Sequence, residues 1–168
     1  AEESVAHVSM AHPVNSRLGD WCEQACQDEG IPVHRGGTYL AMEGPQFSTL
    51  AESMLYRQWG CDVIGMTNMP EAKLAREAEI PYCTVAMVTD YDCWHEDHDQ
   101  VTIDMVVANL MQNSETAQKV IANAVSRLPI SRECECADAL ASAIITRPEA
   151  IPLQVRRELA PIISKYVT

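Results

Sequence analysis

The sequence predicts an α/β fold, because strand-like and helix-like segments alternate along the chain. Three apolar segments, residues 38–42, 61–66 and 81–89, have the composition and length of strands. A helical pattern follows each of them, and no repeat, low-complexity segment or long linker interrupts the 168 residues. We therefore expect one domain over residues 1–168, with its sites at the C-terminal ends of the strands.

The first two elements are a helix and a strand. Apolar positions recur at helical spacing over residues 18–29, and Gly30 is placed to end that helix. The strand at 38–42 follows a pair of glycines, and Pro45 forces a turn or loop after it.

The second helix has a recognisable start and stop. Thr49 and Glu52 match a capping box, in which the threonine caps the helix and the glutamate reaches back to it. The helix is therefore expected to begin there and to run to about Trp59, where Gly60 stops it.

A strand, a helix and a second strand come next. Residues 61–66 form a short apolar segment, and Pro70 suits the first turn of a helix over residues 71–78. Residues 81–89 are rich in apolar and β-branched side chains and give the strongest strand prediction in the chain.

A long helix is predicted over residues 101–128, and Pro129 ends it. Two shorter helices, at residues 137–145 and 153–166, form a helical C-terminal tail. The apolar residues of the long helix fall on one stripe: Ile103, Val106, Val107, Leu110, Ala117, Ile121, Ala124 and Leu128.

Composition and charge exclude several classes of function. Apolar residues make up 47% of the chain and charged residues 21%, which suits a packed globular protein. The net charge of -12 argues against nucleic acid or an anionic membrane surface as a partner. No apolar run reaches the roughly 18 residues that a transmembrane helix needs.

The cysteines do not form the framework of a small disulfide-rich protein, because they are scattered and odd in number. No second pair lies at the spacing of a zinc finger, so free or buried thiols are favoured over a metal site. The two cysteines closest in sequence are the candidate for a local, strained disulfide. In order, the seven are Cys22, Cys26, Cys61, Cys83, Cys93, Cys134 and Cys136.

Polar residues follow two of the predicted strands. Asp90 and Asp92 come after the segment 81–89, and alternate residues of an extended segment point the same way. Two carboxylates in one crevice suit acid–base chemistry, whereas the alternative is a pair of loop caps. Thr67 and Asn68 precede a helix, where they suit either an anion or sugar site or simple helix capping.

Histidines near acidic residues raise a metal hypothesis. His95 and His98 flank Glu96 and Asp97, which is a combination that transition metals accept. The stretch is very polar and precedes a helix, so a solvated loop is the favoured interpretation.

Several motifs together resemble a known family. Residues 43–52 read EGPQFSTLAE, similar to the EGPxFSxxAE motif of the trimeric purine nucleoside phosphorylases, and residues 65–71 resemble their GMTxxPE segment. Residues 89–94, TDYDCW, and residues 6–11 are similar to the methylthioadenosine branch of that family. The match extends over about residues 6–128 and identifies the chain as a C-terminal portion of such an enzyme. The fold it implies is a mixed central sheet flanked by helices.

The resemblance implies roles for the matched residues. Asp90 and Asp92 would be catalytic: Asp90 would meet the N7 and N6 edge of the purine, and Asp92 would help to hold the base. Thr67 would bind phosphate as well as substrate. The other substrate-binding residues would be Phe47 near the purine and ribose, Ser48 at the base, Met66 under the ribose, and Val101, Ile103, Val106 and Val107 around the 5'-substituent, with His7 reaching that pocket from a neighbouring subunit.

The implied reaction is the phosphorolysis of 5'-methylthioadenosine. The leaving purine needs a proton at N7, and general acid catalysis contributes about 10²–10⁴-fold. The branch that acts on inosine and guanosine has an asparagine at the position matched by Asp90, so the aspartate favours adenine. The apolar side chains of residues 101–107 suit a methylthio group, since a buried unpaired hydroxyl costs about 1–3 kcal/mol.

The phosphate-binding loop and basic ligands of the family lie upstream of the matched region. We therefore expect an N-terminal portion, absent from these residues, to be the partner that supplies them, and we expect 1–168 alone to be inactive. The resemblance further implies a cytoplasmic homotrimer, or a multiple of one, that needs no cofactor and uses phosphate as co-substrate. The alternatives are a methylthioinosine or general purine phosphorylase, and a non-catalytic nucleoside-binding or assembly subunit of this fold.

Overall fold

The computed structural model describes residues 4–95, 103–129 and 134–167. Contacts divide the chain into two compact units, each built from segments that are distant in sequence. The first unit comprises residues 1–19, 69–83 and 129–168, and the second comprises residues 20–68 and 84–128. Apart from His7, all of the expected site residues fall in the second unit.

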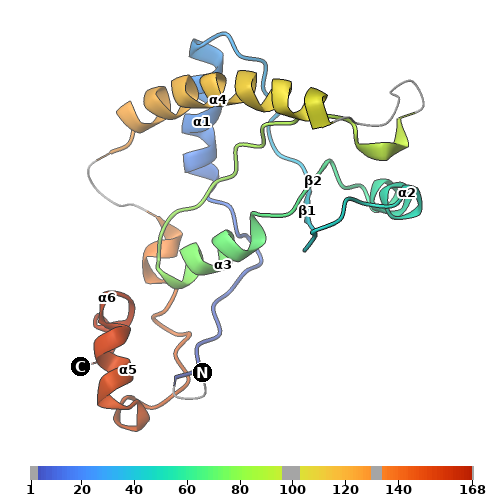
Figure 1. Cartoon of the computed structure of the whole chain (residues 1–168). Helices are drawn as coiled ribbons and strands as arrows, with labels where there is room; N and C mark the ends of the chain where they lie inside the picture. Colours follow the sequence, from blue (N-terminus) through green and yellow to red (C-terminus); the bar gives the residue numbers. More distant parts are fainter. Residues whose placement is uncertain (1–3, 96–102, 130–133, 168) are drawn as a thin grey trace. The chain divides into compact units, whose positions relative to one another are not determined.

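The second unit contains a β-α-β arrangement made of β1 (Tyr39–Ala41), α2 (Leu50–Gln58) and β2 (Val63–Gly65) (Figure 1). The two strands are parallel, with Tyr39 opposite Val63 and Ala41 opposite Gly65. Because parallel strands end at the same edge of a sheet, the loops that follow β1 and β2 start side by side.

The predicted capping box is confirmed. The Thr49 side chain accepts from the backbone N–H of Glu52, and the Glu52 carboxylate accepts from the backbone N–H of Thr49 at 2.8 Å. Gly60 takes a φ of 76° directly after the C-cap residue Trp59, a conformation that glycine adopts without a steric penalty.

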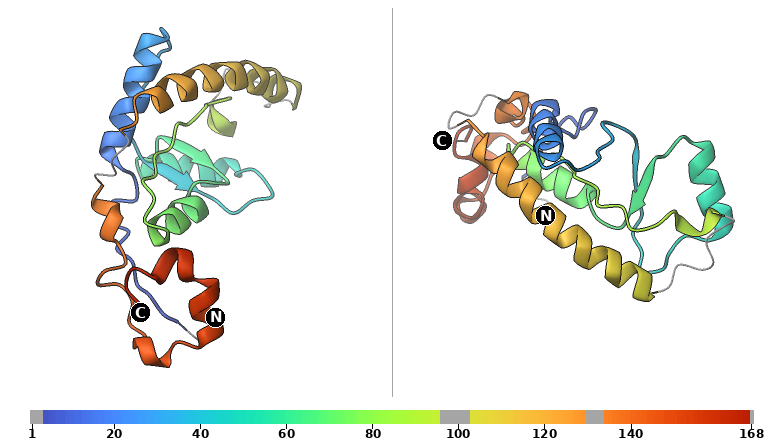
Figure 2. Two further views of the ribbon diagram at one scale, coloured as in Figure 1. Left: turned by 90° about the vertical axis from the view of Figure 1, so that its left-hand side faces the viewer. Right: turned by 90° about the horizontal axis from the view of Figure 1, so that it is seen from above.

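Two helices form the core of the second unit. The predicted first helix is α1 (Ser16–Asp28), of which residues 20–28 belong to this unit, and the predicted long helix is α4 (Ile103–Ser126). Figure 2 shows the two helices crossing. Ala25 and Cys26 of α1 pack there against Val120 and Ala124 of α4. The crossing buries small side chains, which allows the helices to approach closely.

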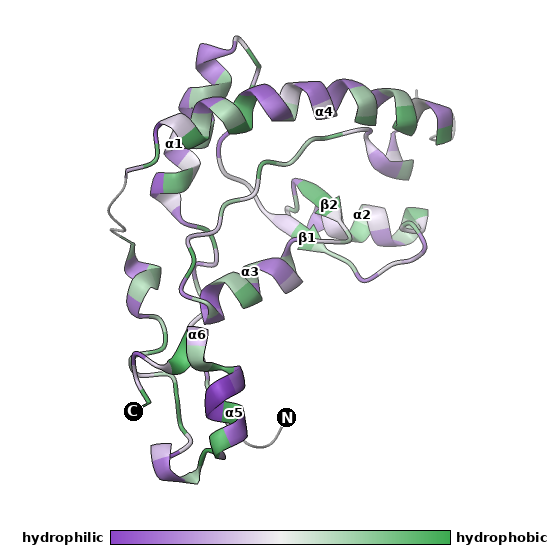
Figure 3. Ribbon diagram, turned by 60° about the vertical axis from the view of Figure 1, so that its left-hand side comes forward, coloured by the Kyte–Doolittle hydropathy of each residue, from purple (hydrophilic) through white to green (hydrophobic). Residues whose placement is uncertain are grey.

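The apolar stripe of α4 is only partly buried. Apolar and polar residues are interspersed along the helix (Figure 3), because an apolar stripe on a helix recurs every three or four residues. Ala124 is in the core, but Val120 beside the stripe is buried as well, while Ile103 is 81% exposed and Ile121 59% exposed. The burial of α4 is therefore set by one crossing point rather than by the whole stripe.

The prediction of a strand at residues 81–89 was wrong. That segment forms no β-ladder with the described residues, and its carbonyl oxygens at Val88 and Thr89 accept instead from the side-chain amides of Asn113 and Asn109. A strand exists only when a neighbouring backbone pairs with it, which composition does not reveal. The chain thus carries a two-stranded parallel sheet among its described residues.

The first unit is made of short elements. These are α3 (Met69–Glu77), η2 (Glu135–Asp138), η3 (Pro148–Ala150), α5 (Leu153–Glu158) and α6 (Ala160–Ile163). An isolated antiparallel bridge joins Ala6 to Ile144. The apolar core of the first unit consists of Ile151, Ile163 and Val167.

The prediction of an α-helix at residues 137–145 was also wrong. The N–H groups of Ala137 and Ala139 donate three residues back along the chain, as in a 3₁₀ helix. The N–H of Leu140 donates to the Glu79 carboxylate at 3.0 Å rather than to a carbonyl four residues earlier. This contact from outside the segment competes with the α-helical ladder.

The helix predicted at residues 153–166 is present as two pieces. α5 ends at Glu158 and α6 begins at Ala160. Pro161 lies at the start of α6, where it lacks the N–H that would continue the hydrogen bonding of α5.

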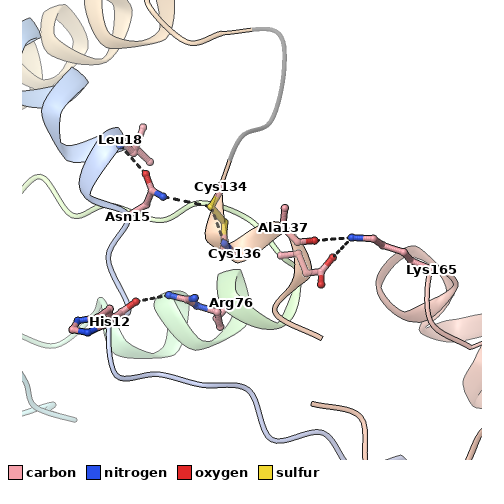
Figure 4. The surroundings of a disulfide bond; sticks show 9 residues. His12, Asn15, Leu18, Arg76, Cys134, Cys136, Ala137 and Lys165 are labelled. Carbon is pink, nitrogen blue, oxygen red and sulfur yellow. Dashed lines mark hydrogen bonds and ion pairs between the residues drawn. A yellow bond between two sulfur atoms is a disulfide. The ribbon is translucent and has the colours of Figure 1, made fainter. Parts of the chain in front are cut away.

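Cys134 and Cys136 form a disulfide, at the place where the sequence indicated one. Figure 4 shows its surroundings. The side-chain amide of Asn15 donates to the Cys134 sulfur at 3.4 Å, and the side-chain oxygen of Asn15 accepts from the backbone N–H of Leu18 at 2.8 Å. Asn15 thus caps the first turn of α1 while it contacts the disulfide.

The described chain is mostly helical, with one small parallel sheet. The larger mixed sheet that was expected is not seen among these residues. In the part of the chain that the structure describes, every helix is too short or too polar to span a bilayer.

Candidate functional site

Contacts within the second unit connect the loops after β1 and β2 to each other and to the segment that precedes Asp90. A side chain on Gly44, in the loop after β1, would meet the Met66 sulfur, after β2, at 2.6 Å, so this loop lies directly against Met66. Asn68 is hydrogen-bonded to Thr84, which lies in the segment that leads to Asp90. The loops after β1 and β2 are therefore in contact, and the second of them contacts the segment that precedes Asp90.

Gly44 is required for that close approach. It takes a φ of 74°, where a Cβ is strained, and it leaves no room for one against Met66. The loop then continues to Ser48, whose hydroxyl lies 3.7 Å from the Met42 sulfur, and to Phe47, which is 80% exposed. An exposed phenylalanine beside a hydroxyl gives this loop an apolar face suited to stacking and a polar group next to it.

Asp90 and Asp92 are linked to each other by the turn that contains them. The Asp90 carboxylate accepts from the N–H of Asp92 at 2.9 Å and from the Thr89 hydroxyl at 2.6 Å. Asp92 has a φ of 59° and begins the short helix η1 (Asp92–Trp94). The segment is not extended here, so the prediction that both side chains point the same way from an extended strand was wrong.

The loop-cap interpretation of Asp90 therefore holds in this structure. An ionised carboxylate has about four lone-pair sites, so two local donors leave capacity for a ligand. Asp90 is exposed and Asp92 half-buried, which leaves the first carboxylate accessible.

Met66 and Thr67 follow β2 directly. Met66 is half-buried beneath the loop after β1, and Thr67 is exposed. Asn68 takes a φ of 79°, which turns the chain sharply after them. Thr67 lies beyond the end of β2, and its exposed side chain is accessible to a ligand from solvent.

The apolar residues at the start of α4 differ in exposure. Ile103 is 81% exposed and Val107 45% exposed, whereas Val106 is half-buried. Val101 lies outside the described residues. His7 is exposed in the first unit.

The metal hypothesis gains no support from the described residues. His95 is half-buried among aromatic rings, with its centroid 5.0 Å from that of Tyr91 and 5.1 Å from that of Trp94. His98 lies outside the described residues. Within the described ranges, no three His, Cys, Asp or Glu side chains lie together as metal ligands.

Two residues of α2 that the sequence did not single out, Arg57 and Ser53, contact η1. The Arg57 guanidinium stacks over the Trp94 ring, 3.5 Å from its centroid. The Cys93 thiol donates to the backbone carbonyl of Ser48 at 3.5 Å and is hydrogen-bonded to the hydroxyl of Ser53. The only sequence signal for them is that a tryptophan and an arginine occur in neighbouring elements.

Sequence similarity to known proteins extends over most of the chain. Residues 1–126 match the phosphorylase superfamily. The S-methyl-5'-thioadenosine phosphorylase of Rhodospirillum rubrum is 57% identical over 166 residues, which cover 97% of this chain and 56% of that protein. The chain thus spans little more than half the length of the curated relatives it matches.

Solved structures agree with this relationship. A methylthioadenosine phosphorylase from an antarctic soil metagenomic library is 45% identical, with a TM-score of 0.86 over 96% of this chain and 58% of that one. A double mutant of the adenosine/methylthioadenosine phosphorylase of Schistosoma mansoni, solved in complex with adenine, is 29% identical, with a TM-score of 0.74 over 83% of this chain and 55% of that one.

Proposed function

The chain belongs to the phosphorylase superfamily, and we propose that it supplies the base, ribose and 5'-substituent sites of an enzyme that cleaves 5'-methylthioadenosine. The observation that carries this proposal is the 57% identity to an S-methyl-5'-thioadenosine phosphorylase over 97% of the chain. The contacts that join the loops after β1 and β2 to the segment before Asp90 support it.

In the proposed reaction, a phosphate oxygen attacks C1' of the ribose on the face opposite the base. The bond between C1' and N9 breaks, its electron pair goes to the purine, and a proton reaches N7. The products are adenine and 5-methylthioribose 1-phosphate. Asp90 accepts from the 6-amino group and donates or shares the N7 proton, which lowers the barrier to departure of the base.

The other proposed roles are those that the resemblance implies. Phe47 stacks near the purine, Ser48 and Asp92 hold it, and Met66 packs under the ribose. Thr67 binds phosphate together with residues outside this chain. The apolar 5'-pocket is formed by Val101, Ile103, Val106 and Val107, with His7 of a neighbouring subunit.

We further propose that the phosphate loop comes from the portion of the phosphorylase that has no counterpart in these 168 residues. The chain carries 12 basic against 24 acidic residues, and the relatives are nearly twice as long. The assembled enzyme would be a cytoplasmic homotrimer or a multiple of one.

A chimeric protein tests this function. The part of the Rhodospirillum rubrum relative that this chain does not match is fused to residues 1–168, and adenine release is measured with phosphate. We expect turnover of methylthioadenosine by the chimera, lower turnover of methylthioinosine and inosine, and none by residues 1–168 alone. Turnover by residues 1–168 alone would refute the shared phosphate site, and a preference for inosine would refute the substrate.

The second candidate is a non-catalytic nucleoside-binding subunit. It is favoured by the charge of the chain, because 12 basic residues against 24 acidic ones leave few cations to bind phosphate. A chimera that binds methylthioadenosine in calorimetry but releases no adenine would support this candidate over the enzyme.

A further inference from the structure

η1, which carries Asp92, is held against α2 by side chains outside the proposed substrate site. Arg57 lies in the last turn of α2, and Ser53 lies one turn earlier on the same helix. Together with Cys93 they connect η1 to α2 and to the loop before it. We refer to Arg57, Ser53 and Cys93 as the η1 clamp.

The contact between Arg57 and Trp94 forms one side of the clamp. A guanidinium 3.5 Å from the centre of an indole ring is within the range of a strong cation–π contact. The Tyr91 ring meets Trp94 edge-on at 6.2 Å, so the indole is restrained from two directions. Arg57 therefore restrains the C-terminal residue of η1.

Cys93 forms the other side of the clamp. Its thiol donates to the carbonyl of Ser48, the residue proposed to contact the base, and is bonded to Ser53, which is 2% exposed. The Cys93 side chain is exposed overall, but partial desolvation of its thiol, together with the nearby Asp92 carboxylate, raises the pKa of that thiol. The clamp thus ties the backbone at Ser48 directly to the residue after Asp92.

The backbone at Asp92 needs such support. The φ of 59° at Asp92 is unfavourable for a residue with a Cβ. On the N-terminal side of Asp92, the Asp90 carboxylate accepts from its N–H. Cys93 and Trp94 hold it from the following side. Strained turns of this kind persist where their surroundings determine them.

We propose that Arg57 and Cys93 are positioning residues, which fix the place of Asp92 relative to Ser48 without touching the substrate. The positions that they fix matter for catalysis only if Ser48 and Asp92 hold the base, so this part rests on the proposed function. The restraint on η1 itself rests on the contacts above.

The first test measures the restraint and needs no activity. Iodoacetamide alkylation of Cys93 is followed by mass spectrometry in the wild-type chain and in Arg57→Ala, with the half-buried Cys61 as internal reference. We expect several-fold faster alkylation of Cys93 in Arg57→Ala, an intermediate rate in Arg57→Lys, and the wild-type rate in the control Gln58→Ala. An unchanged rate in Arg57→Ala would overturn the clamp.

The second test measures positioning in the chimera. Arg57→Ala is expected to lower kcat/KM for methylthioadenosine by about tenfold, with partial rescue by lysine, because small misplacements of contacting groups are costly. Cys93→Ala is expected to do the same, and Cys93→Ser, which keeps a donor, to retain more activity. Faster alkylation with unchanged kcat/KM would overturn the positioning role. If the wild-type chimera releases no adenine, the proposed function fails, and alkylation alone decides whether the clamp exists.

Discussion

Asp90 has a structural role in its turn, in addition to the catalytic role that we propose for it. Its carboxylate accepts from Asp92 and Thr89 and so holds the turn that presents both acidic residues. Capping and catalysis were alternatives in the sequence, but a carboxylate has enough lone pairs for both. The two roles are separable, because an asparagine keeps the carbonyl oxygen that caps the turn.

The first prediction concerns Asp90→Asn and Asp90→Ala in the chimera. Asparagine retains the cap and offers an amide to a 6-oxo group, so turnover is expected to shift towards methylthioinosine, with methylthioadenosine turnover reduced by roughly 10²-fold. Alanine removes the cap as well and is expected to lower turnover of both. Steady-state kinetics with both substrates checks this, and an unchanged ratio in Asp90→Asn would count against the assignment.

Glu79 has a comparable structural role in the first unit. Its buried carboxylate accepts from the Tyr166 hydroxyl at 2.5 Å and the Leu140 N–H at 3.0 Å, and Lys165 lies 3.5 Å away. Burial alone raises the pKa of Glu79, but these hydrogen bonds and the lysine charge outweigh it and hold the pKa below its ordinary value of 4.5. The ionised form therefore stabilises the folded tail.

The second prediction follows from that direction. Because the folded pKa is lowered, the stabilisation from Glu79 is fully present above about pH 4.5 and is lost as the pH falls through the lower folded value. Glu79→Gln should therefore destabilise the chain at pH 7 and reduce the loss of stability in acid. Thermal unfolding between pH 7 and pH 3 measures both effects. Glu77→Gln, at an exposed neighbouring position, is the control and should follow the wild type.

At the scale of elements, helix boundaries were predictable where local chemistry sets them. Thr49 and Glu52 cap α2 through their own side chains and backbone, and Gly60 ends it through its own φ. Residues 81–89 and 137–145 were not predictable in the same way. The first needs a pairing backbone, and in the second the Leu140 N–H is taken by Glu79, which is 61 residues away in the sequence.

The third prediction concerns the capping box. Thr49→Ala removes the acceptor for the Glu52 N–H and one donor to its carboxylate, so stability should fall by about 0.5–2 kcal/mol. Denaturant unfolding followed by circular dichroism measures the change. In the control, Thr116→Ala on α4, the lost hydroxyl bonds only the carbonyl of Gln112 in the preceding turn, and the change should stay within about 0.5 kcal/mol. Equal effects of the two substitutions would argue against the cap.

At the scale of the whole molecule, the described fold leaves apolar surface and backbone open. Val85 is 40% exposed and Val88 62% exposed, and the N–H groups of residues 85–88 have no hydrogen-bond acceptor among the described residues. An apolar segment with open N–H groups is suited to pairing with another strand. This fits the proposal that the remaining portion of the phosphorylase completes the sheet here.

The fourth prediction tests that completion. Amide hydrogen exchange of residues 85–88 should be fast in residues 1–168 alone and slow in the chimera, because pairing gives these N–H groups acceptors. Mass spectrometry of peptides across this segment measures the change, with α2, which is hydrogen-bonded in this chain, as the protected reference. Exchange that stays fast in an active chimera would show that the segment does not become a strand.

Features that depend on neighbouring residues were predictable from the sequence. These are the capping box at Thr49, the helices α1, α3 and α4, the disulfide between Cys134 and Cys136, and the motifs that indicated the family. Each depends on side chains and backbone within a few residues, whose interactions do not require the rest of the chain.

The contacts between distant groups became apparent from the three-dimensional structure. It showed that Gly44 lies on Met66, that Asp90 caps Asp92, that Arg57 stacks on Trp94, and that residues 81–89 lack a strand partner among the described residues. Burial and pairing depend on backbones far apart in sequence, so no local pattern encodes them. That is why the candidate site residues could be named from the sequence, while the contacts that position them could not.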